Sequence, residues 1–165
     1  MKSFYLISLG CPKNLVDSEG MATLLRRAGY HAAMVPEEAD LLIVNTCGFI
    51  ESAREESRAV LRELAASKKR DQQIIAAGCY SQRCPDQLAS YVPGIDGLLG
   101  TRRWMDILDL VEQLEERERL LRNATACGEL SDARGPRPTE PVYHLPEAAT
   151  VGQDTRGVVR AAPQG

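Results

Sequence analysis

Three of the five cysteines occupy comparable places in the sequence, each just after an apolar run and beside a glycine. They are Cys11 after residues 3–9, Cys47 after residues 40–45 and Cys79 after residues 73–77. Thiolates are soft ligands that suit iron–sulfur clusters and zinc. Because only three recur in this pattern, a [4Fe–4S] cube bound here would keep one iron free of a protein thiolate. The pattern predicts that these three cysteines are metal ligands.

Two other interpretations of the cysteines stay open at this point. Buried cysteines commonly act as small hydrophobic residues, and for any one of the three that role is the default. Zinc would require a fourth ligand, for which Cys84 is spaced too loosely from Cys79. Both histidines, His31 and His144, are expected away from the strand ends. We assign Cys84 to packing and Cys127 to the start of the tail.

The elements that would position the cysteines follow from hydrophobic periodicity. Five strands are expected, over residues 3–9, 30–35, 40–45, 73–77 and 95–99. Between and after them helical spacing predicts helices around residues 21–28, 50–64, 86–91 and 104–122. The alternation predicts an α/β fold, a doubly wound and mainly parallel five-stranded sheet with flanking helices.

The order of the strands determines whether the cysteines meet. In the common order 2-1-3-4-5, strands one, three and four are neighbours about 4.8 Å apart. Ligands of such sheets bind at the carboxyl ends of the strands. Cys11, Cys47 and Cys79 would then lie within roughly 10 Å, a span that an iron–sulfur cluster can bridge.

Composition limits the domain organisation and the partners. One domain is expected over residues 1–122, followed over 123–165 by a linker or irregular tail rich in Pro and Gly. The formal net charge is only −3, with no basic cluster, so this domain is not expected to bind nucleic acid directly. No apolar stretch approaches a membrane span or a signal peptide. A cytoplasmic location is expected, where thiols stay reduced.

Other candidate residues carry weaker signals. The acidic residues could include a catalytic carboxylate, but charged helix faces are usually just solvated; they are Asp17, Glu19, Glu51, Glu55 and Glu56. Asp17 and Glu19 are explained by the dipole of a nearby helix N-terminus. No glycine-rich phosphate loop is present. We therefore assign no catalytic residue.

Three longer motifs surround the cysteines and resemble one known family. They are SLGCPKNLVDSE at 8–19, NTCGFIESA at 45–53 and AGCYSQR at 77–83. In this order and spacing they are similar to the signatures of the radical S-adenosylmethionine methylthiotransferases, over residues 1 to about 115. The form with Pro12 and Lys13 after the cysteine resembles the RimO branch, which modifies an aspartate of a small-subunit ribosomal protein, more than the tRNA-modifying branch.

The resemblance implies roles for individual residues. Cys11, Cys47 and Cys79 would carry an auxiliary [4Fe–4S] cluster whose open iron handles the sulfur to be transferred. Four polar residues would shape the pocket around it: Lys13, Asn14, Asn45 and Thr46. The partner of the complete enzyme would be the ribosomal protein.

The chain departs from the family in one respect. Family members continue into a radical domain with a CxxxCxxC motif and then a β-barrel, and no CxxxCxxC occurs in these 165 residues. S-adenosylmethionine and a second [4Fe–4S] cluster would belong to that missing part, so the chain alone is expected to be inactive. The alternatives are the matching domain of a tRNA methylthiotransferase and a metal-free α/β interaction module.

Overall fold

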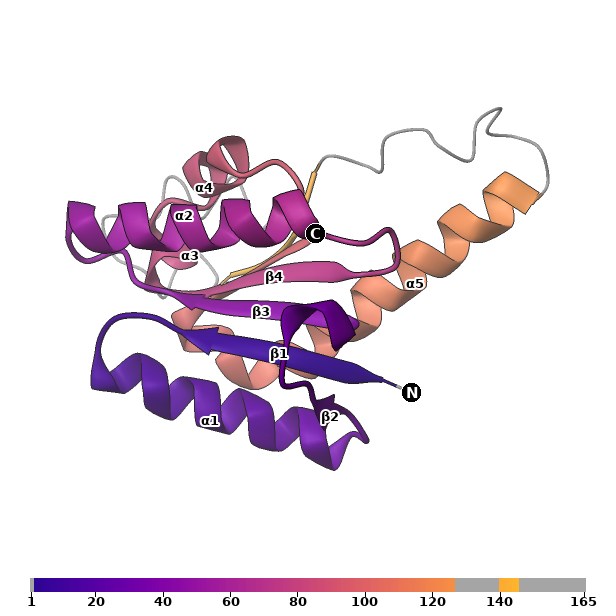
Figure 1. The fold of residues 1–165 in the computed structure, drawn as a ribbon, viewed down its shortest axis with the longest axis horizontal. Coiled ribbons are helices and arrows are strands. Elements are labelled where there is room, and N and C mark those ends of the chain that lie inside the picture. The colour runs from indigo at the N-terminus through magenta and orange to yellow at the C-terminus, as the bar shows by residue number, and fades with distance from the viewer. Residues whose placement is uncertain (1, 127–139, 146–165) are drawn as a thin grey trace.

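The fold was analysed in a computed structural model that describes residues 2–126 and 140–145. A parallel sheet forms its centre, with the strand order β2-β1-β3-β4-β5-β6 (Figure 1). The strands are β1 (Ser3–Ser8), β2 (His31–Ala32), β3 (Leu41–Thr46), β4 (Gln73–Gly78), β5 (Gly97–Gly100) and β6 (Val142–His144). The α/β class, the parallel pairing and the order of the first five strands confirm the sequence-based prediction.

Helices cover both faces of the sheet, as a parallel sheet requires. They are α1 (Pro12–Arg27), α2 (Glu51–Ser67), α3 (Cys79–Arg83), α4 (Pro85–Tyr91) and α5 (Ile107–Ala126), with the 3-10 turns η1 (Pro36–Glu38) and η2 (Thr101–Asp106). One apolar core joins the sheet to α1 and α5, and a second joins the opposite face to α2, α3 and α4. None of the helices in the described residues is long and apolar enough to span a bilayer.

The two central strands explain the strongest sequence signal. Every residue of β3 and of β4 is buried, which is why both runs are continuously apolar instead of alternating. Along β3, Ile43 packs into the core beneath α1 and α5, whereas Val44 packs into the core beneath α2. The two cores together cover both faces of these central strands.

The structure adds two details to the prediction of five strands followed by an irregular tail over 123–165. Helix α5 runs on to Ala126, and the short segment Val142–His144 pairs in parallel with β5 as a sixth strand. The backbone N–H of Val142 donates to the carbonyl of Asp96 at 2.8 Å, and Arg117 donates to the carbonyl of Glu140 at 3.2 Å. A three-residue strand between prolines carries too little periodicity to be detected. The rest of the tail, including Cys127, lies outside the described residues.

Two helix starts also differ from expectation. Helix α1 begins at Pro12, directly after Cys11, and so starts earlier than the helix expected around residues 21–28. Proline is favoured in the first helical turn because its missing N–H would have no intrahelical partner there. The five-residue helix α3 begins at Cys79, in a segment where no helix was expected. Both corrections place a predicted ligand at the very start of a helix.

Candidate metal centre

The carboxyl edge of the sheet brings the ends of three neighbouring strands together. The β3–β4 register pairs Thr46 with Gly78, so Cys47 and Cys79 each follow one member of that pair. The β1–β3 register pairs Ser8 with Asn45. Ser8 is the last residue of β1, so Cys11 lies three residues beyond the end of that strand. The structure thus places all three predicted ligands at one edge, on strands that are immediate neighbours. In the described residues none of these cysteines takes part in a disulfide.

The side chain of Cys47 lies against the backbone of Gly10. A Cβ built on Gly10 would stand 2.5 Å from the Cβ and 2.7 Å from the Sγ of Cys47, closer than any side chain permits. Gly10 also has φ +87°, a conformation that residues with a Cβ rarely adopt. Glycine here lets the loop that carries Cys11 approach the Cys47 thiol.

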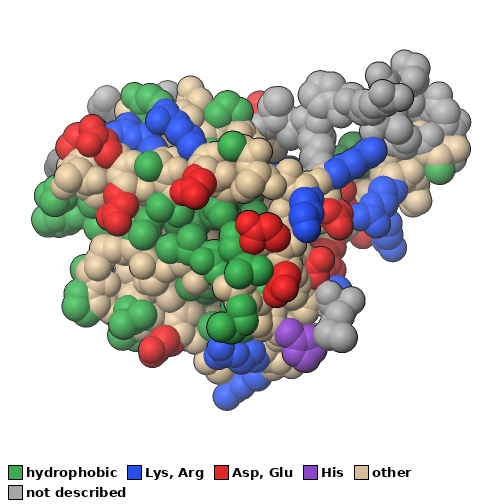
Figure 2. Space-filling view, in the orientation of Figure 1, with side chains coloured by type: hydrophobic (Ala, Val, Ile, Leu, Met, Phe, Trp, Pro, Cys, Tyr) green, Lys and Arg blue, Asp and Glu red, His purple; other side chains and the backbone are tan. Residues whose placement is uncertain are grey.

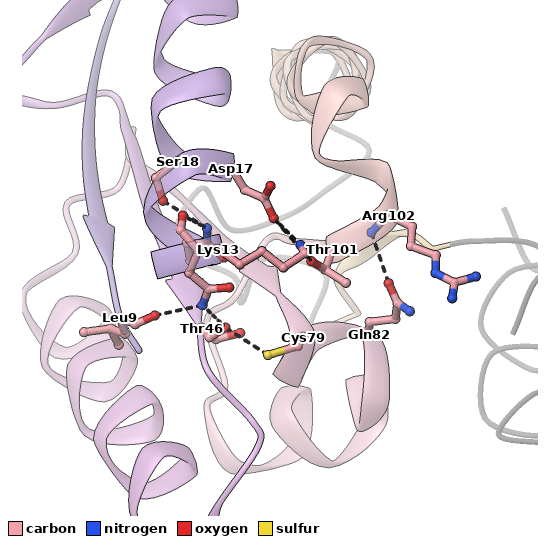
Figure 3. A network of polar contacts seen from close by, with 11 residues as sticks. Leu9, Lys13, Asp17, Ser18, Thr46, Cys79, Gln82, Thr101 and Arg102 are labelled. Atoms are coloured by element: carbon pink, nitrogen blue, oxygen red, sulfur yellow. Dashed lines mark hydrogen bonds and ion pairs between the residues drawn. The ribbon is translucent and has the colours of Figure 1, made fainter. Parts of the chain in front are cut away.

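Cys79 is held at the start of α3 by contacts with the β3 end. The backbone N–H of Gly48 donates to the Cys79 Sγ at 3.4 Å, and the thiol itself donates to the carbonyl of Thr46 at 3.7 Å. Gly78, at φ +96°, makes this turn possible, because a Cβ there would stand 2.5 Å from the Oδ1 of Asn45. Figure 3 shows the sulfur of Cys79 pointing toward Thr46.

The three thiols differ in their access to solvent. Cys47 is buried at 7% exposure, Cys79 is half-buried and Cys11 is exposed. A group held by all three would therefore have protein behind it and an open side. Beneath it, Tyr80 is fully buried and touches the backbone of Gly48. Burial raises the pKa of the Tyr80 phenol above its ordinary value.

Two buried asparagines tie the strand ends to α1. The Nδ2 of Asn14 donates to the carbonyls of Leu9 at 2.8 Å and of Thr46 at 3.0 Å, which joins the end of β1 to the end of β3. The Nδ2 of Asn45 donates to the carbonyl of Asn14 at 2.8 Å and to Ser18 at 2.9 Å. These bonds satisfy backbone groups that the ends of strands leave unpaired.

Two serines complete this polar scaffold and were missed in the sequence. The hydroxyl of Ser57, on α2, accepts from the N–H of Cys47 at 3.1 Å and lies 3.2 Å from its carbonyl. Ser81 donates to the carbonyl of Ala76 at 2.8 Å. Ser57 interrupts an otherwise apolar helix stripe, and that interruption was the one signal available. Helix α3 is too short to show a periodic apolar stripe, so Ser81 gave no comparable signal in the sequence.

Lys13 and Asp17 form an ion pair above the same edge. The ammonium lies 2.7 Å from the Asp17 carboxylate and donates to Thr101 at 3.0 Å, which links α1 to η2 (Figure 3). Asp17 is buried and is the sixth residue of α1, so our explanation of it by the helix dipole was wrong. Glu19 remains exposed. Of the four pocket residues implied by the resemblance, Lys13 is the only exposed one.

A second group of potential ligands lies beside β6. The ligand atoms of Asp106, Asp109 and His144 all fall within 4.8 Å of one another. Arg103 already supplies a cation there, because it pairs with Asp106 and its Nη2 lies 3.0 Å from the Nε2 of His144. His144 is the last residue of β6, so the expectation that both histidines lie away from strand ends was wrong for it. Cys84 packs against the second core, as expected.

Comparison with known proteins identifies the family. The model of the family described as "Uncharacterized protein family UPF0004" matches residues 3–100, which contain all three cysteines of the carboxyl edge. The chain belongs to this family. The UPF0004 match covers β1 to β5 and ends before η2, so β6 and α5 lie outside it.

Several curated relatives of this UPF0004 chain carry the name "Ribosomal protein uS12 methylthiotransferase RimO". The protein from Chloroflexus aurantiacus is 52% identical over 112 residues, which is 68% of this chain and 24% of the relative. That from Roseiflexus sp. is 46% identical over 127 residues (77% and 26%), and that from Pelotomaculum thermopropionicum 46% over 134 residues (80% and 30%). The chain thus spans about a quarter of the length of these relatives.

Proposed function

We propose that this chain is the cluster-binding part of a RimO-type methylthiotransferase, with Cys11, Cys47 and Cys79 holding an auxiliary [4Fe–4S] cluster. The observation that supports the proposal is that three free cysteines follow three adjacent parallel strands at their carboxyl ends. Methylthiotransferases are the relatives that share this part of the chain. S-adenosylmethionine and a second cluster would be bound by the remainder of the longer enzyme.

The residues present fit such a group. The three proposed ligands are thiols, which iron–sulfur clusters prefer, and Gly10 lets the loop before Cys11 lie against the Cys47 side chain. The Gly48 N–H already points at the Cys79 sulfur, the kind of hydrogen bond that tunes bound clusters. When bound, the cluster would offer one iron without a protein thiolate, where an external sulfur can bind.

The chain's own residues would position the ligands and limit the access of water. Ser57 holds the backbone of Cys47 at both its N–H and its carbonyl, so this thiol cannot shift without breaking two buried contacts. Asn14 and Asn45 lock the β1 and β3 ends together. The exposed position of Cys11 leaves the outer side open toward a second domain or a substrate.

The substrate we propose is the ribosomal protein uS12, which the names of the relatives give. The modified group would be an aspartate side chain, as the resemblance to the RimO branch implies. The test is a chimera in which this chain replaces the matching part of the Chloroflexus aurantiacus relative. Mass spectrometry of uS12 should show the methylthio group. A chimera that loads its clusters but modifies only tRNA would contradict the proposed substrate.

The cluster itself is tested on the chain alone. Anaerobic reconstitution with iron and sulfide should give about four irons per chain. Replacing Cys11, Cys47 or Cys79 by alanine should abolish loading, whereas Cys84→Ala, a half-buried cysteine of the core, should leave it unchanged. Full loading in all three variants, or a folded chain that stays colourless, would overturn the proposal in favour of a metal-free module.

A further inference from the structure

Strand β1 lies inside the sheet but is not buried like an inner strand. It pairs with β2 on one side and with β3 on the other. All residues of β3 and β4 are buried, whereas Phe4 is the only buried residue of β1. Phe4 belongs to the core beneath α1, so the face of β1 toward α1 is covered. The opposite face carries Tyr5 and Ile7, neither of which is fully buried.

The cause is a crossover without an α-helix. The connection from β2 to β3 must cross β1 on the face that carries α2, because parallel crossovers are right-handed. This connection contains only the three-residue turn η1, whereas α1 and α2 fill the neighbouring crossovers. Helix α2 packs mainly over β3 and β4. Among the described residues, no helix fills this crossover position of the doubly wound fold.

The vacancy exposes a continuous set of apolar side chains, which we call the β1 face. It consists of Tyr5, Ile7 and Leu9, which are half-buried, and of Met34 and Val35, which are 87% and 42% exposed. Figure 2 shows hydrophobic side chains gathered over β1 between α2 and α1. Contiguous apolar surface of this kind typically marks an interaction site.

Acidic residues border the β1 face. At 100° per residue, Glu56 and Glu63 lie beside Val60 on the flank of α2 that faces away from α4. The other flank of α2 is basic, and its Arg58 stacks on Tyr91 of α4. Glu37 of η1 is exposed as well, and Figure 2 shows Asp and Glu side chains along the margin of the apolar area.

We infer that the β1 face is the docking surface for the remainder of the longer enzyme, through an apolar segment flanked by basic residues. The inference rests on the proposed function, since the relatives are about four times as long as their match to this chain. The acidic border favours a basic partner and opposes a second copy of this chain, because two acidic borders would face each other. The occupant fills the position of the missing crossover helix.

The experiment uses two methionines of this chain as reporters. Hydroxyl-radical labelling is read by mass spectrometry in the isolated chain and in the full-length chimera with the Chloroflexus aurantiacus relative, both metal-free. Met34 should lose most of its labelling in the chimera, a several-fold decrease. Met105, which is 63% exposed on η2, reports contacts at the carboxyl edge separately. Unchanged labelling of Met34, with or without protection of Met105, would overturn the inference.

Matched variants test the face itself. Within the chimera, Met34→Lys should restore the labelling of Tyr5 to its level in the isolated chain, whereas Met105→Lys should leave Tyr5 protected. Protection of Met34 that appears in the isolated chain and grows with its concentration would overturn the inference in favour of a dimer. The labelling does not require the cluster. If iron loading fails while Met34 is protected, the proposed cofactor is overturned, but the docking surface is supported.

Discussion

Gly10 and Cys47 are in contact at a distance that excludes any side chain on the glycine. A Cβ at position 10 would lie 2.7 Å from the Cys47 Sγ, and the φ of +87° would strain it as well. The loop that carries Cys11 therefore meets the Cys47 thiol through bare backbone. This contact couples the geometry of two proposed ligands.

The first prediction concerns that contact. Gly10→Ala should lower the free energy of unfolding by more than the about 1–2 kcal/mol of the left-handed conformation alone, because the Cys47 thiol must also move. Iron loading after reconstitution should fall with it. Urea denaturation and iron analysis measure the two effects.

Gly29 provides the matched control for this change. It has φ +93°, but a Cβ there would meet nothing within 4 Å. Gly29→Ala should therefore cost only the conformational strain, about 1–2 kcal/mol, and leave iron loading intact. Equal iron loading in both variants would show that the Gly10 contact does not position the thiol.

The second prediction concerns Asn14, which bridges the ends of β1 and β3. Asn14→Ala removes both donors and leaves the carbonyls of Leu9 and Thr46 without them. The Thr46 carbonyl keeps the Cys79 thiol as a donor, so the cost is about that of one unsatisfied buried group, and the free energy of unfolding should fall by about 1–3 kcal/mol. Chemical denaturation measures this change.

Thr23 serves as the control for Asn14. Its hydroxyl donates to the carbonyl of Glu19 on the exposed side of the same helix. Thr23→Ala should change the stability by less than about 0.5 kcal/mol. If Asn14→Ala proves equally mild, the bridge between the strand ends is not a source of stability.

The third prediction concerns Asp96 at the other edge of the sheet. Its buried carboxylate accepts from the N–H of Ile74 at 2.8 Å and pairs with Lys68 and, at 3.4 Å, with Arg117. Asp96→Asn would leave two poorly compensated cations, and breaking a buried pair costs about 3–5 kcal/mol. The measurement is again the free energy of unfolding.

An exposed ion pair gives the comparison. Glu116 pairs with Arg119 on α5, and both side chains are open to solvent. Glu116→Gln should cost less than about 1 kcal/mol. A loss in Asp96→Asn no larger than this would mean that solvent screens the Asp96 pairs despite their burial.

The fourth prediction concerns alkaline pH and strand β6. Burial, and then the carboxylate of Asp86, raise the pKa of Tyr143 to about 12. In the unfolded chain the phenol titrates near about 10. Between these values the unfolded state releases a proton that the native state keeps, so stability should fall as the pH rises from about 10 to 12.

Tyr143→Phe should make that decline shallower, and unfolding curves recorded at successive pH values test it. A second decline is expected from Tyr30, whose pKa is raised by burial and by its hydrogen bond to Glu115. Tyr30→Phe therefore provides an independent comparison. Identical slopes in wild type and Tyr143→Phe would contradict the assigned environment of this phenol.

The positions of the cysteines and the buried strands were readable from the chain because they depend on local patterns. A strand covered on both faces must be continuously apolar, so β3 and β4 could be recognised without knowing their neighbours. The order 2-1-3-4-5 is the common one for such sheets, and the first five strands have it. The glycines beside the three cysteines could also be read from the chain, because each is a direct neighbour in the sequence.

Other features arise from contacts between residues far apart in the chain. Strand β6 forms because the N–H of Val142 donates to the carbonyl of Asp96. A run of three residues between prolines is too short to predict this pairing from the sequence. Asp17 looked like a surface charge until the fold buried it beside Lys13 and Thr101. The vacancy over β1 depends on a crossover that lacks a helix. Such relationships come from packing. The environment of a residue is then set by elements distant in the chain, which the residues next to it in the sequence do not reveal.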